Sequence, residues 1–201
     1  MRYGIFGGSF SPPHDGHVAL ARAFMRELSL DRLYVVPAKS PPHKKLDCGA
    51  SASDCVDMCR AAFAPLGEEC RISEYEMEDG VSGYPVDTLR HFAGSGEMFM
   101  LCGSDMFLTL DSWREPAQIF SLATVVCAAR VDDPETDAAL ARAAEHYRCI
   151  YGGESVVMKI PPVEISSTEI RRTLESGGIP HGIPDGVLDI IRDRGLYGYR
   201  K

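Results

Sequence analysis

The chain has 201 residues, of which 45% are hydrophobic and 25% are charged, a composition typical of an ordinary folded domain. Its formal net charge of -8 argues against DNA or RNA as the main partner, because nucleic-acid sites need a strongly basic surface. No stretch approaches the ~18 apolar residues of a membrane helix, and the chain starts on an apolar segment without a targeting sequence. We therefore expect a cytoplasmic protein with no membrane partner.

Short apolar runs alternate with longer amphipathic stretches over the first 160 residues. The runs predict strands over 3–7, 32–37, 97–103, 123–130 and 155–160, with a charged edge strand over 70–78. The amphipathic stretches predict helices over 16–29, 53–64, 85–94, 134–147 and 166–176. Strand and helix in alternation predict an α/β fold, a Rossmann-like, doubly wound, mostly parallel sheet that binds its ligand beyond the carboxyl ends of the strands.

Residues 161–201 have a different pattern, with two helical segments and no strand between them. We interpret them as a small C-terminal helical appendage to a core over 1–160, so that 1–201 form a single domain. The seven cysteines are irregularly spaced, which predicts reduced thiols that fill space and argues against a disulfide framework or a zinc site. They are Cys48, Cys55, Cys59, Cys70, Cys102, Cys127 and Cys149.

The segment YGIFGGSFSPPHDGH places glycines where the first strand turns into the first helix. Gly7 and Gly8 let the backbone approach a phosphate closely. A hydride-transferring dinucleotide enzyme would offer a similar loop, but it would also carry an acidic residue at the end of its second strand. The second strand here leads to Lys39 instead.

His14 and His17 fall at the start of that first helix. The positive end of a helix dipole disfavours an imidazolium unless an anion is bound. Two histidines beside free N–H groups are therefore more consistent with a phosphate cradle than with simple packing.

GGSFSPPHDGH resembles the G-G-[ST]-F-[DN]-P-x-H-x-G-H signature of the nucleotidyltransferases, which join a nucleotide to a phosphorylated acceptor. Ser11 replaces the usual Asp or Asn. The resemblance implies that the loop and the helix start hold nucleotide phosphates, through Gly7, Gly8, Ser9, Phe10, His14 and His17.

Two further segments are rich in groups that could bind phosphate. PAKSPPHKK carries Lys39, His43, Lys44 and Lys45 without an acid, which favours a lid over a polyphosphate, although a solvated basic loop is the alternative. ISSTEIRR matches the I-S-S-T-x-I-R signature of the same superfamily and predicts a capping box at the start of a helix. The expected ligands of ATP in these two segments are Lys44, Ser166, Ser167, Thr168 and Arg171.

Other segments resemble the nicotinate-nucleotide adenylyltransferase branch: PPHK, GYPVDTL, FMLCGSDMFLTLDSWRE and IPDGVLDIIRDRGLYG. This resemblance implies that Gly103 and Asp105 serve the ATP ribose. It also implies that Trp113 stacks on the pyridine ring and that the backbone N–H groups of Val86 and Arg114 bind the nicotinate carboxylate. Gly83 and Pro85 replace the usual Ser and Thr, which removes one hydroxyl. The residues expected to bind nicotinate mononucleotide are Gly8, Ser9, Tyr84, Val86, Trp113 and Arg114.

The implied reaction is adenylyl transfer from ATP to nicotinate mononucleotide, with His14, His17, Lys44 and Arg171 as the catalytic residues. Mg²⁺ is expected to arrive with ATP and to need no dedicated protein site. ATP and nicotinate mononucleotide are the expected partners, with a homo-oligomer left open. The alternatives are a pantetheine-phosphate adenylyltransferase and a non-catalytic nucleotide-binding regulator on the same fold.

Overall fold

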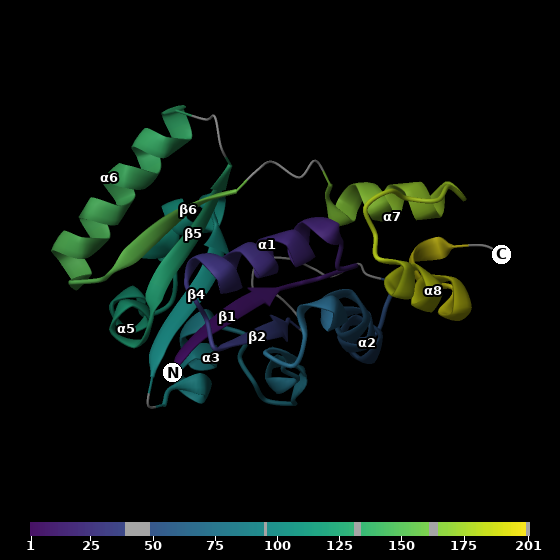
Figure 1. The fold of residues 1–201 in the computed structure, drawn as a ribbon, viewed down its shortest axis with the longest axis horizontal. Helices are drawn as coiled ribbons and strands as arrows, with labels where there is room; N and C mark the ends of the chain where they lie inside the picture. Colours follow the sequence, from purple (N-terminus) through teal and green to yellow (C-terminus); the bar gives the residue numbers. More distant parts are fainter. Residues whose placement is uncertain (39–48, 95, 131–133, 161–164, 200–201) are drawn as a thin grey trace. The chain divides into compact units, whose positions relative to one another are not determined.

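The computed structural model describes residues 1–38, 49–94, 96–130, 134–160 and 165–199 (Figure 1). Six strands form one sheet in the order β3-β2-β1-β4-β5-β6. The pairings of β1 with β4, β4 with β5 and β5 with β6 are parallel, and this order is that of a Rossmann-like fold. The predicted α/β class is confirmed, and the charged strand β3 lies at the edge, as expected. The strands are β1 (Arg2–Gly8), β2 (Arg32–Pro37), β3 (Cys70–Ile72), β4 (Glu97–Gly103), β5 (Thr124–Arg130) and β6 (Ser155–Ile160).

Every predicted helix is present, with ends that move by a few residues. Two helices, α4 and α5, were not predicted, because five and seven residues are too short to show a helical period. The helices are α1 (Asp15–Glu27), α2 (Ala52–Phe63), α3 (Pro85–Phe92), α4 (Ser104–Leu108), α5 (Pro116–Leu122), α6 (Pro134–Tyr151), α7 (Ser167–Glu175) and α8 (Asp185–Arg194). Short 3₁₀ turns cover Ala64–Leu66, Tyr75–Met77, Leu110–Ser112 and Leu196–Gly198.

The chain divides into two compact units. Unit 1 comprises Met1–Gly7, Ala23–Tyr34 and Tyr84–Pro162, and unit 2 comprises Gly8–Arg22, Val35–Gly83 and Val163–Lys201. Each unit is described by itself below. The division into a core over 1–160 and an appendage over 161–201 stays a prediction.

Unit 1 is built on the apolar runs of its strands. Residues 98–101 of β4 and 125–127 of β5 are all buried, as expected of parallel strands covered on both faces. Gly4 in β1 shows how close the packing is, since a Cβ atom there would lie 2.6 Å from side-chain atoms of Phe24 and Leu30.

No helix in the described ranges has the length and apolarity that crossing a lipid bilayer requires.

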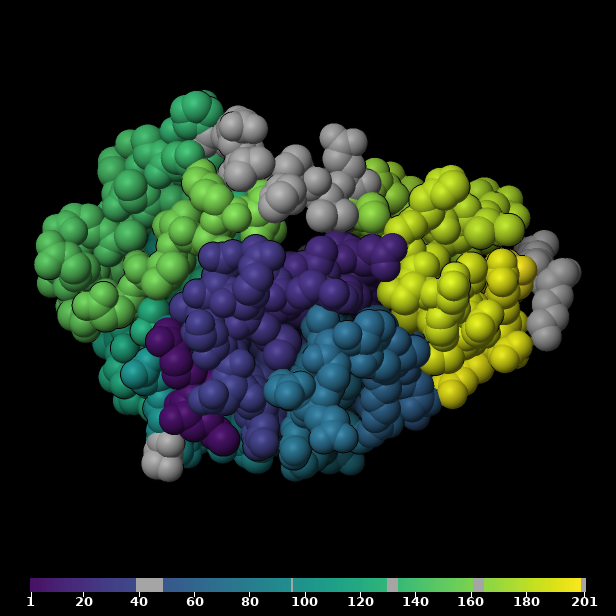
Figure 2. All heavy atoms as spheres, in the orientation of Figure 1, coloured from purple at the N-terminus to yellow at the C-terminus, as the bar shows by residue number. Residues whose placement is uncertain are grey.

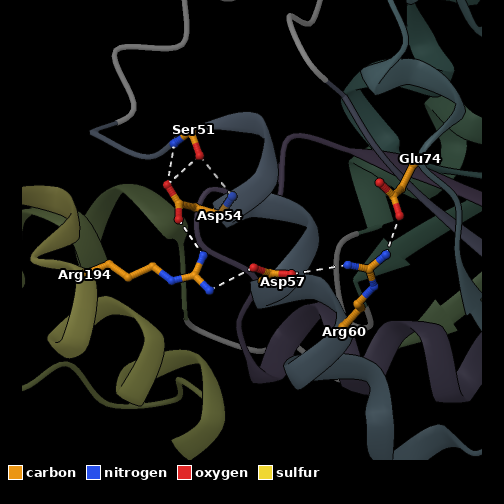
Figure 3. Close-up of polar contacts among 6 residues, drawn as sticks. All are labelled: Ser51, Asp54, Asp57, Arg60, Glu74 and Arg194. Carbon is orange, nitrogen blue, oxygen red and sulfur yellow. Dashed lines mark hydrogen bonds and ion pairs between the residues drawn. The ribbon is translucent and has the colours of Figure 1, made fainter.

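Unit 2 joins the helices α2 and α8 through charged side chains (Figure 3). The guanidinium of Arg194, the last residue of α8, donates to Asp54 at 2.7 Å and to Asp57 at 2.9 Å. Asp54 also completes a capping box with Ser51 at the start of α2. Arg60 continues the network from Asp57 toward β3 by pairing with Glu74. The two helices contact each other, and in Figure 2 atoms in the blue of α2 lie beside atoms in the yellow of α8.

Candidate active site

The order of the strands reverses beside β1, which has β2 on one side and β4 on the other. Ligands of open α/β sheets bind outside the carboxyl ends of the strands at such a point. In the register of β1 and β4, Phe6 pairs with Leu101. Gly7 and Gly103 therefore follow at the carboxyl ends of neighbouring strands, where the sequence analysis placed a nucleotide. Both glycines are exposed and have open space where a Cβ atom would lie.

The loop from β1 to α1 turns sharply around Phe10. Phe10 has a φ of 42°, uncommon for a residue other than glycine, and its side chain is only 1% exposed. A Cβ atom at Gly8 would lie 3.0 Å from the Phe10 ring, so glycine allows this close packing. The ring also meets the edge of His17, with 5.1 Å between centroids. The buried Phe10 ring therefore shapes the loop, and the role of Phe10 in phosphate binding stays a prediction.

The two histidines lie against each other, with ring centroids 3.7 Å apart. His14 immediately precedes α1, and its carbonyl accepts hydrogen bonds from the N–H groups of His17 and Val18. Its own N–H donates to Nδ1 of His17 at 3.2 Å. A neutral imidazole that accepts at Nδ1 carries its proton on Nε2, so Nε2 of His17 is a donor.

Both imidazoles are neutral at pH 7. Burial lowers the pKa of His14 from 6.5 to about 4. Burial, with a smaller contribution from His14, lowers the pKa of His17 to about 3. Desolvation is thus the main cause of the lowered pKa values. An anion bound here would favour the protonated forms and raise both pKa values.

One polar atom of this pair has no partner. The side chain of His14 is 7% exposed, and its Nδ1 atom makes no hydrogen bond within the described part of the chain. A buried polar group without a partner costs about 1–3 kcal/mol. Such an atom beside a glycine loop indicates a site that a ligand completes.

Helix α7 supplies the third segment of this part of the site. Ser166 caps the helix in the predicted capping box with Glu169. Oγ of Ser167 donates to the carbonyl of Pro12 at 2.9 Å, and Nη1 of Arg171 donates to the carbonyl of Ser11 at 2.6 Å. The structure therefore brings the start of α7 to the loop that carries His14. Arg171 was expected to contact phosphate, and it uses one of its nitrogens to hold that loop.

Within unit 1, residues 84–89 of the segment GYPVDTL meet the segment SWRE, as the resemblance implied. The guanidinium of Arg114 lies over the ring of Tyr84, 5.0 Å from its centroid. Arg90 of α3 forms an ion pair with Glu115, the residue before α5, at 2.5 Å. This hydrogen bond lowers the pKa of the Glu115 carboxyl. Arg90 also pairs with Asp87, and Glu115 also pairs with Arg114. We call these four residues the α3–α5 cluster: Asp87, Arg90, Arg114 and Glu115.

The other acceptor-side candidates differ in exposure. Val86 is fully buried and lies in the first turn of α3, where N–H groups lack an acceptor within the helix. Trp113 is half-buried just before α5, and Asp105 is exposed at the start of α4. Gly103 is the N-cap of α4, so Asp105 lies in the first turn of the helix and does not cap it.

Some of the predicted site residues lie outside the described part of the chain, and one residue that contacts the site was not predicted. Lys44 lies outside the described residues, together with the rest of PAKSPPHKK from Lys39 on. Ser9 is half-buried and Thr168 is exposed, with Thr168 accepting a hydrogen bond from Arg171. Sequence reasoning missed Tyr197, whose hydroxyl meets Oγ of Ser11, because nothing in the sequence marks a contact across 186 residues.

Comparisons with known proteins identify the family of the chain. A profile of the Cytidylyltransferase-like family matches residues 5–173. Two proteins described as probable nicotinate-nucleotide adenylyltransferases, from Neisseria meningitidis and Solibacter usitatus, are each 33% identical to this chain. Each match covers 98% of this chain, and it covers 98% of the Neisseria protein and 100% of the Solibacter protein. The fold matches the Plasmodium falciparum nicotinic acid mononucleotide adenylyltransferase complexed with NaAD, with a TM-score of 0.75, 17% identity and coverage of 99% and 98%. The chain therefore belongs to the cytidylyltransferase-like family and, within it, to the nicotinate-nucleotide adenylyltransferases.

Proposed function

We propose that the chain transfers the adenylyl group of ATP to nicotinate mononucleotide in NAD biosynthesis, forming the deamido dinucleotide and pyrophosphate. A phosphate oxygen of the mononucleotide attacks the α-phosphorus of ATP. The bond from that phosphorus to the oxygen bridging to the β-phosphate breaks, and pyrophosphate leaves. The acceptor phosphate is already ionised at neutral pH, so the reaction needs alignment and charge stabilisation and no general base.

The observation that carries this proposal is the neutral pair His14 and His17 at the start of α1. Nε2 of His17 donates to a phosphate oxygen, and Nδ1 of His14 gains its missing partner when ATP binds. Two neutral donors in a buried loop stabilise negative charge that develops at phosphorus and on the leaving group. Gly7, Gly8 and Ser9 let the backbone approach the triphosphate, and Gly103 and Asp105 hold the ribose.

The remaining phosphate ligands are Lys44, Ser166, Ser167, Thr168 and Arg171. Lys44 acts as a point charge on the β- and γ-phosphates, and Arg171 turns its remaining N–H groups to the departing pyrophosphate. Mg²⁺ arrives with the triphosphate and is bound mainly by phosphate oxygens and water.

The pyridine ring and carboxylate of the acceptor bind to residues of unit 1, while Gly8 and Ser9 of unit 2 also bind the mononucleotide. Trp113 stacks on the pyridine ring, and the N–H groups of Val86 and Arg114 donate to the nicotinate carboxylate. The contact of Arg114 with Tyr84 supports this assignment, because it shows that the two segments carrying these N–H groups meet. The cytoplasmic location and a homo-oligomer remain predictions.

A pyrophosphate-release assay with ATP, Mg²⁺ and a panel of acceptors tests the function. We expect release only when nicotinate mononucleotide or, more slowly, nicotinamide mononucleotide is present, together with a dinucleotide product. Release with 4′-phosphopantetheine alone would identify the pantetheine branch instead. Binding of ATP without release for any acceptor would identify a nucleotide-binding regulator.

A further inference from the structure

The loop before His14 makes three hydrogen bonds with the C-terminal part of unit 2, all at Ser11 and Pro12, and a fourth joins the N–H of Asp15 to the carbonyl of Gly182 at 2.9 Å. Arg171 donates to the carbonyl of Ser11, and Ser167 donates to the carbonyl of Pro12, as described above. The third contact joins two side chains, Oγ of Ser11 and the hydroxyl of Tyr197, at 3.2 Å. These contacts fix both the backbone and the side chain of Ser11, three residues before His14.

The hydroxyl pair is almost completely buried, with Ser11 2% exposed and Tyr197 4% exposed. Water cannot replace either partner easily in such a place, so removing the Tyr197 hydroxyl deprives Oγ of Ser11 of this hydrogen bond. The loop would then relax toward an arrangement in which Ser11 finds another partner. Residues 9–14 would move with it, because they are joined through the backbone.

Tyr197 is itself held in an unusual conformation. Its φ of 55° and ψ of 34° lie in the left-handed region, which is uncommon for a bulky residue and persists only where the surroundings enforce it. Gly49 lies against its backbone, and a Cβ atom at Gly49 would be 3.2 Å from the Tyr197 nitrogen. On the other side, α8 is docked on α2 through Arg194. The backbone of Tyr197 is therefore held in place, and its side chain extends from there to Ser11.

We propose that Tyr197 is a positioning residue for adenylyl transfer, acting through its hydroxyl on Ser11 so that His14 meets the phosphates of ATP. This inference rests on the proposed function. Tyr197 touches neither ATP nor the acceptor, and its effect reaches the reaction only through the loop of residues 9–14. The C-terminal segment, the farthest part of the chain from the glycine loop in sequence, thus sets the geometry of that loop.

The test is a double-mutant cycle on the full-length chain with Ser11→Ala, Tyr197→Phe and the double variant. Each is assayed for kcat/KM with ATP and for the Kd of a non-hydrolysable ATP analogue. Tyr199→Phe is the matched control, because it also removes a tyrosine hydroxyl near the C-terminus, and that hydroxyl makes no hydrogen bond to any described residue. Hydrogen exchange of the backbone amides in 9–17 measures directly how easily the loop opens.

We expect each single variant to lose about tenfold in kcat/KM and in affinity for the analogue, with the double variant no worse than either single one. Amides of 9–17 should exchange faster in all three, and Tyr199→Phe should match the wild type. The proposal is overturned if Tyr197→Phe lowers the melting temperature but leaves Kd and kcat/KM within twofold, or if the two single effects add.

A wild type that makes no pyrophosphate with any acceptor would disprove the proposed function instead. The inference would then be decided by the analogue's Kd and by exchange, which need no turnover. Coupled losses of affinity would support it there, and independent losses or none would overturn it.

Discussion

At the start of α1, His14 is buried, His17 is half-buried and the loop before them is held by hydrogen bonds from distant segments, whereas the charges of the α3–α5 cluster are exposed or, at Asp87, half-buried. His14 is 7% exposed, while the side chains of Arg90 and Glu115 are 41% and 43% exposed. Buried polar groups are costly to leave unpaired, and exposed ion pairs contribute little. The two regions should therefore respond to substitution on different scales, large for the histidine pair and small for the cluster.

The largest effect is expected for His17→Ala. Losing one donor to developing charge typically costs roughly 10²–10³ in rate, so we expect kcat to fall by that factor with a melting temperature close to wild type. Steady-state kinetics and thermal unfolding check this, with exposed His181→Ala as the control. Activity within threefold of wild type would remove His17 from the mechanism.

The pH dependence of stability is the next largest effect. Both histidines have pKa values in the folded state below the ordinary 6.5, so the unfolded chain binds protons first as pH falls. The free energy of unfolding should therefore decrease from about pH 6.5 down toward pH 4, by up to about 1.4 kcal/mol per pH unit for each histidine.

Urea unfolding at several pH values measures this slope. In His14→Gln, the slope of the unfolding free energy against pH should decrease in that range by the contribution of one proton. A variant with an unchanged slope would show that His14 is not buried in its neutral form. Isothermal titration calorimetry in buffers of different ionisation enthalpy gives a second check, because ATP binding near pH 6 should take up protons.

A modest effect is expected for Arg114→Ala. An exposed cation over an aromatic ring is worth about 0.5–1 kcal/mol, so we expect the KM for nicotinate mononucleotide to rise about threefold while the KM for ATP stays unchanged. Arg142→Ala, exposed on α6, is the control. An equal rise in both KM values would argue that Arg114 does not act on the acceptor alone.

The smallest effect is expected for Glu115→Gln. Its partners Arg90 and Arg114 are exposed, so we expect almost no change in the free energy of unfolding. The midpoint of urea denaturation measures it. A clear fall of that midpoint in Glu115→Gln would show that the α3–α5 cluster is as important to stability as a buried contact.

Sequence periodicity predicted every strand and the long helices, because their apolar residues repeat over several turns or alternate within a run. It missed α4 and α5, although Pro116 at the first position of α5 is a signal of a helix start. The histidine pair and the capping box at Ser166 were predicted because their partners are close in sequence.

The contacts that tie the loop to the C-terminal segment were not predicted. Arg171 to Ser11 spans 160 residues and Ser167 to Pro12 spans 155, and such pairings depend on how the folded chain packs. The resemblance to a known family implied that the segments GYPVDTL and SWRE meet, which spacing alone did not, and the contact of Arg114 with Tyr84 was found only in the structure.

The central claim is that this chain adenylylates nicotinate mononucleotide, with N–H groups aimed at the carboxylate of its pyridine ring. The most direct measurement is kcat/KM for nicotinate and nicotinamide mononucleotide at saturating ATP and Mg²⁺, in the wild type and in Pro85→Thr. We predict a preference for the acid of at least about tenfold, or roughly 1.4 kcal/mol, and a larger one in Pro85→Thr, which restores a hydroxyl. A wild type that favours the amide, or treats both alike, would contradict the account.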